Sequence, residues 1–105
     1  MKILVVCGAG ASSTFVAQRL RHAAQARGRD ISAIAGTEQS LPIDLDDADI
    51  VLVGPHLHTS LERIRRQASV RGARVILLPP EAFTDLDGTR TLDLVDAALN
   101  EDGAR

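Results

Sequence analysis

The chain has 105 residues, 45 % of them hydrophobic, which suffices for one compact domain (residues 1–105) and excludes two. Its formal charge of −2 and its aromatic content, two Phe with no Trp or Tyr, lack the basic excess and the stacking platforms of a nucleic-acid-binding protein. A single cysteine excludes an internal disulfide and a Cys-rich zinc site, and suits a reducing cytoplasm.

The opening segment, residues 1–7, ends in a cysteine, as the signals of bacterial lipoproteins do. Its apolar run is shorter than the roughly 7–15 residues of a signal core, and small residues follow it. No other segment approaches the roughly 20 apolar residues of a membrane span. We therefore expect a cytoplasmic protein that contacts a membrane only through a partner.

In chain order, the first element is a short apolar run at residues 3–6, which predicts a buried strand. A loop of small residues follows it. Apolar residues then recur at helical spacing opposite a polar face, which predicts an amphipathic helix that ends at Gly28. The apolar positions of this helix are Val16, Leu20, Ala23 and Ala24.

The middle of the chain holds a weaker strand, a stretch without a clear period and a stronger strand. Residues 31–35 alternate only partly, so we place this strand at an edge of the sheet. Residues 36–49 show no period and carry four Asp, so we expect a loop or a degraded turn of helix. Residues 50–53 read Ile-Val-Leu-Val, which is typical of a buried parallel strand.

The last third of the chain repeats this alternation. A second helix ends at Gly72, residues 75–78 predict another buried strand, and a C-terminal helix follows the turn Asp87-Gly88-Thr89. The apolar stripe of the second helix comprises Leu57, Leu61, Ile64 and Ala68. Because parallel strands need right-handed crossovers, the predicted fold is α/β, a single doubly wound four-stranded parallel sheet in the order 2-1-3-4 with helices on both faces.

The loop after the first strand combines the cysteine with small and hydroxyl residues. Cys7 is followed by Gly8, Ala9, Gly10, Ala11, Ser12, Ser13 and Thr14, and the first helix begins within this run. Small residues let backbone N–H groups converge, and one of the three hydroxyl residues can cap the helix, whose dipole favours an anion. The same donors would stabilise a thiolate, the nucleophilic form. The run predicts a phosphate-binding loop with Cys7 as the phosphoryl acceptor.

Two simpler interpretations compete with this one. A lone cysteine at the end of a buried strand is more often an inert small hydrophobic residue, although the carboxyl end of a strand is where open α/β sheets place ligands. Low-molecular-weight tyrosine phosphatases share the layout, but they need an Arg six residues after the cysteine, where this chain has Ser13. Without that guanidinium, and without the Gly-Lys-Ser/Thr ending of a nucleotide-binding loop, a phosphoryl carrier is the interpretation left.

Three segments carry a family resemblance: residues 3–14, residues 48–55 (Ala-Asp-Ile-Val-Leu-Val-Gly-Pro) and the pair Asp87-Gly88 before the last helix. On these residues the chain resembles, over essentially its whole length, the enzyme IIB component of the lactose/cellobiose family of sugar phosphotransferases, which includes chitobiose-type systems. The family's usual Met after the loop glycine is Ala11 here.

The resemblance implies a phosphocarrier of a bacterial sugar phosphotransferase system. A phosphohistidine on a partner IIA protein or domain would give its phosphoryl group to Cys7. Cys7 would then deliver the group to a sugar, such as a β-linked disaccharide, held by the membrane component IIC. No metal, nucleotide or other cofactor is implied. The identity of the sugar cannot be read from this chain, because the specificity pocket would lie on IIC.

The sequence leaves two questions open: whether His56 or His58 contributes to the site, and whether an alternative function applies. In the predicted strand order the third strand lies beside the first, so Gly54-Pro55-His56 should flank the Cys7 loop, and His56 or His58 could touch the phosphoryl group. Both stay outside the predicted catalytic set, because a histidine at a helix start is usually a surface residue. The alternative function is a non-catalytic regulatory or phosphate-sensing domain that keeps the loop while the thiol is idle.

Overall fold

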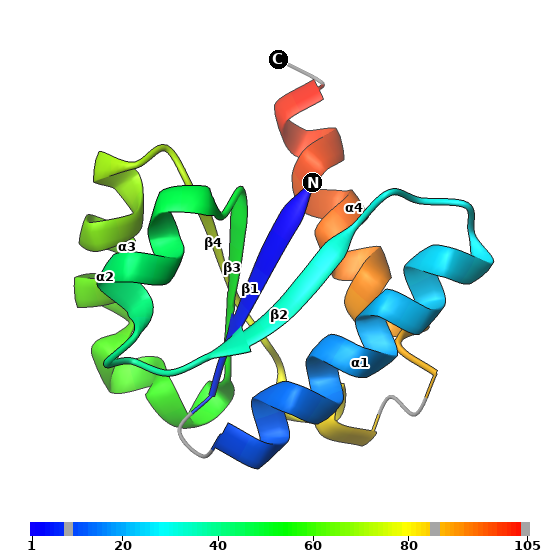
Figure 1. Ribbon diagram of the computed structural model, residues 1–105, viewed down its shortest axis with the longest axis horizontal. Coiled ribbons are helices and arrows are strands. Elements are labelled where there is room, and N and C mark those ends of the chain that lie inside the picture. Colours follow the sequence, from blue (N-terminus) through cyan, green and yellow to red (C-terminus); the bar gives the residue numbers. More distant parts are fainter. Residues whose placement is uncertain (8–9, 85–86, 104–105) are drawn as a thin grey trace.

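The computed structural model describes residues 1–7, 10–84 and 87–103, and within them one four-stranded parallel sheet forms (Figure 1). The strand order is β2-β1-β3-β4, so the prediction of a doubly wound sheet in the order 2-1-3-4 is confirmed. The strands are β1 (Lys2–Val6), β2 (Ser32–Gly36), β3 (Ile50–Val53) and β4 (Arg74–Leu77).

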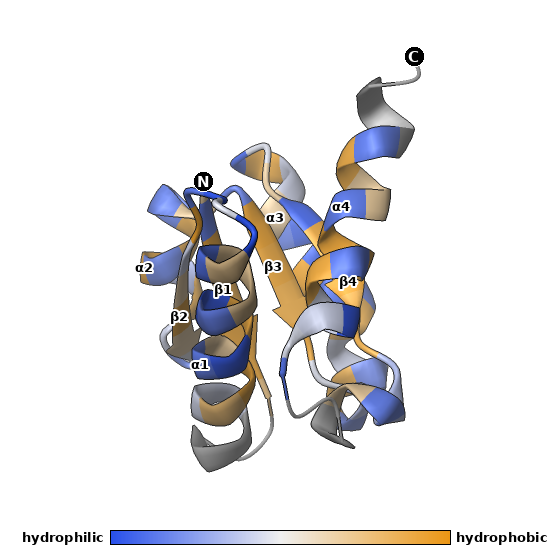
Figure 2. Ribbon diagram, turned by 90° about the vertical axis from the view of Figure 1, so that its right-hand side faces the viewer, coloured by the Kyte–Doolittle hydropathy of each residue, from blue (hydrophilic) through white to orange (hydrophobic). Residues whose placement is uncertain are grey.

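Helices cover both faces of the sheet and divide the core into two layers. The α-helices are α1 (Gly10–Ala26), α2 (Leu41–Asp44), α3 (Leu61–Val70) and α4 (Thr89–Gly103). Short 3₁₀ turns are η1 (Leu45–Asp47), η2 (Pro55–Ser60) and η3 (Pro80–Thr84). Because successive side chains of a strand point to opposite faces, Ile3 and Val5 of β1 join the α1/α4 layer, whereas Leu4 and Val6 join the α2/α3 layer. Hydropathy colouring shows β3 as an apolar strand between the layers (Figure 2).

The parallel register brings the carboxyl ends of three strands together at one edge of the sheet. Val6, the last residue of β1, pairs with Gly36 of β2 and with Val53 of β3. The residues that follow these strands are therefore neighbours, and Cys7 lies between the segments that follow β2 and β3. Open α/β sheets bind ligands at this edge.

Two predicted elements differ in detail, the second helix and the last strand. The second helix begins at Leu61 and not near Leu57, because residues 55–60 form η2, in which Leu57 has non-helical dihedrals (φ −99°, ψ 18°). Leu57 is nevertheless buried, which explains why it fitted the helical stripe. Within residues 36–49, the turn of helix allowed by the sequence is α2 followed by η1.

The prediction of a third buried strand at residues 75–78 is wrong in two respects. β4 ends at Leu77, and its residues are half-buried or exposed. The reason is that β4 is an edge strand, with β3 as its one neighbour in the sheet. Leu78, just past the strand, is the buried residue and packs in the α1/α4 layer.

Gly88, directly before α4, fixes how closely that helix approaches α1. Its φ is +78°, and a Cβ built on it would lie 2.1 Å from the carbonyl oxygen of Arg19. Only glycine combines this dihedral with this approach. Ion pairs then join the turn after α1 to α4, where Arg27 contacts Asp93 at 2.8 Å and Arg29 contacts Asp96. The C-terminal helix is thus held against α1 and against the turn after it.

In the part of the chain described above, no helix has both the length and the apolar character that crossing a bilayer requires.

Candidate functional site

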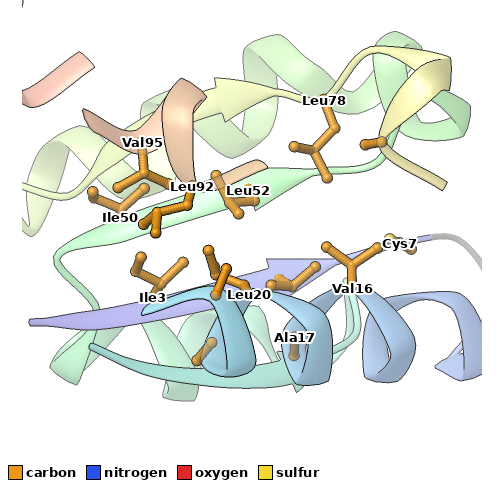
Figure 3. Close-up of a cluster of buried hydrophobic side chains, with 14 residues drawn as sticks. Ile3, Cys7, Val16, Ala17, Leu20, Ile50, Leu52, Leu78, Leu92 and Val95 are labelled. Carbon is orange, nitrogen blue, oxygen red and sulfur yellow. The ribbon is translucent and has the colours of Figure 1, made fainter. Parts of the chain in front are cut away.

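Cys7 follows β1 directly and is 2 % exposed. Its side chain belongs to the α1/α4 layer, at one end of the cluster and beside Val16 of α1 (Figure 3). A structural cysteine would show the same low exposure, so burial alone does not separate a reactive thiol from an inert one. The neighbours of Cys7 distinguish these two cases better than its burial does.

The predicted loop continues from Cys7 into α1. Gly8 and Ala9 lie outside the described residues. Gly10, Ala11 and Ser12 form the first turn of α1, which starts at Gly10. Ser12, Ser13 and Thr14 therefore lie inside the first two turns, so the expectation that one of them caps the helix is wrong.

Ser13 and Thr14 differ in their surroundings. The Ser13 side chain is 1 % exposed, whereas Thr14 is exposed to solvent. Position 13 is the one at which a phosphatase would carry its phosphoryl-clamping Arg, and here a buried serine occupies it.

The first turn of α1 supplies backbone donors to this end of the sheet. In a helix that begins at Gly10, the N–H groups of Gly10, Ala11 and Ser12 have no carbonyl partner within the helix. The amino end of α1 lies at the end of the sheet where β1 finishes (Figure 1). Such N–H groups and the helix dipole favour an anion at this point.

Gly54, directly after β3, contacts Cys7. A Cβ built on Gly54 would lie 3.0 Å from the Cys7 Sγ and 3.3 Å from the Cys7 Cα. The Gly54 N–H donates to the Val6 carbonyl at 2.8 Å, which extends the β1–β3 pairing by one step. The expectation that the segment after β3 flanks Cys7 is confirmed for Gly54. Its role as direct packing partner of the thiol was missed, although a glycine after the strand next to β1 was the available signal.

The two histidines after Gly54 are both exposed on η2. The His58 Nδ1 lies 3.2 Å from the Pro55 carbonyl oxygen, so this ring is folded onto its own turn. Between the histidines, Leu57 is buried in the α2/α3 layer and anchors the turn.

Cationic side chains are absent from the loop after Cys7 and from the first two turns of α1. The sequence has no Lys or Arg from residue 7 to residue 18. The first cation is Arg19, whose guanidinium lies 5.9 Å from the centroid of the Phe15 ring. Phe15 itself is 56 % exposed, and no sequence pattern singled it out. An anion bound at Cys7 would be held by backbone dipoles more than by loop cations.

In the described ranges 1–7, 10–84 and 87–103, no group of three or more His, Cys, Asp or Glu side chains is placed to hold a metal ion.

Comparison with known proteins gives one consistent result. The family model for the lactose/cellobiose-specific IIB subunit of the phosphotransferase system (PTS) matches residues 2–93. The oligo-β-mannoside-specific EIIB component of the PTS from Bacillus subtilis (strain 168) is 24 % identical over 92 residues, which cover 88 % of this chain and 89 % of that protein.

Two solved structures share the fold. The lactose-specific IIB domain from Streptococcus pneumoniae superposes with a TM-score of 0.81 at 16 % identity, over 90 % of this chain and 93 % of that one. The cellobiose-specific IIB protein from Borrelia burgdorferi gives a TM-score of 0.74 at 27 % identity, over 96 % and 93 % of the two chains. The family-model match over residues 2–93 shows that the chain belongs to the lactose/cellobiose-specific IIB family of the PTS.

Proposed function

We propose that Cys7 is the phosphoryl carrier of this IIB protein. The observation that supports it best is the position of the thiol. Cys7 lies at the carboxyl end of the central strand, against Gly54 and at the amino end of α1. Family membership supplies the chemistry that such a site would serve, which is phosphoryl transfer to sugars.

The phosphoryl group would be transferred in two steps, from IIA to Cys7 and from Cys7 to the sugar. The Cys7 thiolate attacks the phosphorus of a phosphohistidine on a IIA partner, so that a P–N bond breaks, an S–P bond forms and the imidazole leaves. A sugar hydroxyl bound to IIC then attacks the phosphorus of phosphocysteine. The S–P bond breaks, a P–O bond forms, the hydroxyl proton is released and the thiolate returns. Neither step consumes a cofactor.

The loop would favour the carrier state in two ways. The N–H groups of Gly10, Ala11 and Ser12 offer donors to phosphoryl oxygens, which develop negative charge during transfer. Ser13 in place of an Arg clamp, buried as it is, leaves the phosphocysteine without the group that would hasten its hydrolysis. A slow hydrolysis is what a carrier needs, because the group must survive until IIC is reached.

The location and the partners follow from this scheme as part of the proposal. A IIB protein that shuttles between IIA and the cytoplasmic side of IIC would work in the cytoplasm and touch the membrane only through IIC. The sugar would be a β-linked disaccharide or a related β-glycoside, since the relatives' names refer to lactose, cellobiose and oligo-β-mannosides. The pocket that chooses among them would lie on IIC.

The test is phosphorylation of the purified protein by a phosphorylated IIA protein of the same organism. Intact-mass spectrometry should show one added phosphoryl group. That group should survive treatment with base and should be lost under conditions that cleave a phosphorus–sulfur bond. The Cys7→Ala variant, which keeps the packing of a small apolar side chain, should show none. Anion binding by the wild type without any labelling would instead favour the phosphate-sensing alternative.

A further inference from the structure

A phosphoryl group on Cys7 would carry close to two negative charges, and the Cys7 loop offers no cation to meet them. Residues 7–18 contain no Lys or Arg. The position of the phosphatase clamp is the buried Ser13. Arg19, the first cation along α1, has its guanidinium over the Phe15 ring. Any cationic side chain that meets the phosphoryl group must therefore come from another segment.

The segment after β3 is the one that the structure places against Cys7. Gly54 is in van der Waals contact with the thiol, as the 3.0 Å between a built Cβ and the Cys7 Sγ shows. His56 follows two residues later, so its Cα lies within about 7 Å of the Gly54 Cα. In Figure 1 the turn after β3 and the first turn of α1 lie at the same end of the sheet, on either side of the end of β1. An imidazole at position 56 has the reach to contact a group on Cys7.

Leu57 determines which way the histidines can point. Its side chain is buried in the α2/α3 layer, and its N–H donates to the Gly54 carbonyl at 3.0 Å. This turns the side chains before and after it out of the core, and both are exposed. The His58 ring is folded back onto the Pro55 carbonyl oxygen, at 3.2 Å from Nδ1. His56 is the nearer of the two to Gly54 along the chain.

We propose that His56 is a phosphoryl-binding residue, whose ring N–H donates a hydrogen bond to the phosphoryl group carried by Cys7 and takes the place of the cation that the loop lacks. This inference rests on the proposed function of Cys7. A neutral imidazole donates one N–H and a charged one adds electrostatic attraction, so the contact exists in both forms. No covalent bond to His56 is formed, and no proton needs to be transferred by it.

The first experiment compares four proteins with phosphorylated IIA: wild type, His56→Gln, His56→Arg and the matched control His58→Gln. At equilibrium His56→Gln should hold about fivefold less phosphocysteine relative to free thiol than the wild type, and its initial rate of labelling should fall similarly. His56→Arg should restore the initial rate of labelling to within about twofold, because it returns a cationic donor. His58→Gln should match the wild type.

The outcomes separate the two proposals. If the wild type labels on Cys7 and His56→Gln labels equally well, the role of His56 is overturned while the carrier function stands. The role of His56 is also overturned if His56→Arg fails to restore labelling, or if His58→Gln loses as much as His56→Gln, since the turn itself would then be the cause. If the wild type does not label at all, both proposals fall.

A second measurement does not depend on kinetics. Ring-nitrogen NMR signals of the three histidines, His22, His56 and His58, are recorded at fixed pH before and after phosphorylation of Cys7. The His56 signals should move, and those of the other two should stay. A shift that is absent at His56, or equal at His58, would contradict direct contact with the phosphoryl group.

Discussion

Two turns at the carboxyl edge of the sheet start from similar strands and are built differently. The turn after β1 enters α1 almost at once, and its first helical residue is Gly10. The turn after β3 passes through six residues of η2, anchored by the buried Leu57, before α3 starts. The first turn places backbone donors and a thiol at the edge of the sheet. In the second turn, Gly54 packs against Cys7, and the side chains of His56 and His58 are exposed. In the proposed function, the first turn would provide the chemistry and the second would support it.

The largest expected effect comes from removing the nucleophile from the first turn. Cys7→Ser should abolish phosphoryl acceptance, because a hydroxyl is far less ionised than a thiol near neutral pH. The fold should survive, since serine is nearly isosteric with cysteine. Intact-mass spectrometry after incubation with phosphorylated IIA measures the first point, and circular dichroism measures the second. Undiminished labelling of the folded variant would refute the assignment of Cys7.

A substitution within the first turn should act on the donors and not on the thiol itself. In Gly10→Val a β-branched side chain enters the place where N–H groups must converge, so phosphoryl acceptance should fall about tenfold while the sheet stays intact. The Cys7 pKa, read from the alkylation rate against pH, should lie below the roughly 8.5 of a free thiol in the wild type and rise in the variant. An unperturbed or higher wild-type value, insensitive to Gly10→Val, would favour the inert buried cysteine.

The second turn can be tested with a matched pair of glycines. Gly54→Ala places a Cβ 3.0 Å from the Cys7 Sγ, whereas Gly36→Ala, at the end of β2, places a Cβ 2.9 Å from its nearest neighbours, the side chains of Leu4 and Asp44. Each variant should lose about 1–3 kcal/mol in the free energy of unfolding, through overpacking. Gly54→Ala alone should also slow labelling of Cys7, by about tenfold, because the thiol is displaced. Equal slowing in both variants would mean that loss of stability, and not contact with Cys7, is responsible.

The smallest effect is expected far from both turns. Arg29→Gln removes the ion pair with Asp96 that joins the turn after α1 to α4, and should lower the free energy of unfolding by about 0.5 kcal/mol. Labelling of Cys7 should not change. Urea unfolding and the labelling assay measure the two quantities. A change in labelling would show that the position of α4 affects the reactivity of Cys7 in the first turn, which we do not expect.

The sequence predicted the parts of the fold that depend on local pattern. The edge position of β2 and a helix that starts within the run after Cys7 follow from the apolar pattern and the small residues, and the strand order follows once right-handed crossovers are added. The second helix was placed too early, because Leu57 is buried by tertiary packing while its backbone is not helical. Periodicity reports burial, and burial does not fix dihedral angles.

The candidate site was predictable in part. A cysteine, small residues and a helix start mark the first turn in the sequence itself. The contact between Gly54 and the thiol joins residues 47 positions apart, and it becomes visible only once β1 and β3 are paired in register. The half-buried state of β4 follows from its place at the edge of the sheet, which the predicted strand order already implied.

Gly88 should tolerate substitution less than Gly28, although both glycines have a positive φ. At Gly28, which also has a positive φ of +67°, nothing lies within 4 Å of a built Cβ, so asparagine could replace it at the cost of backbone strain alone. At Gly88 the same change would drive a side chain into the Arg19 backbone, 2.1 Å away. In a library randomised at both positions and selected for folding, position 28 should return several residue types and position 88 should return glycine. Recovery of residues other than glycine at position 88 would therefore indicate that α4 lies further from α1 in that variant.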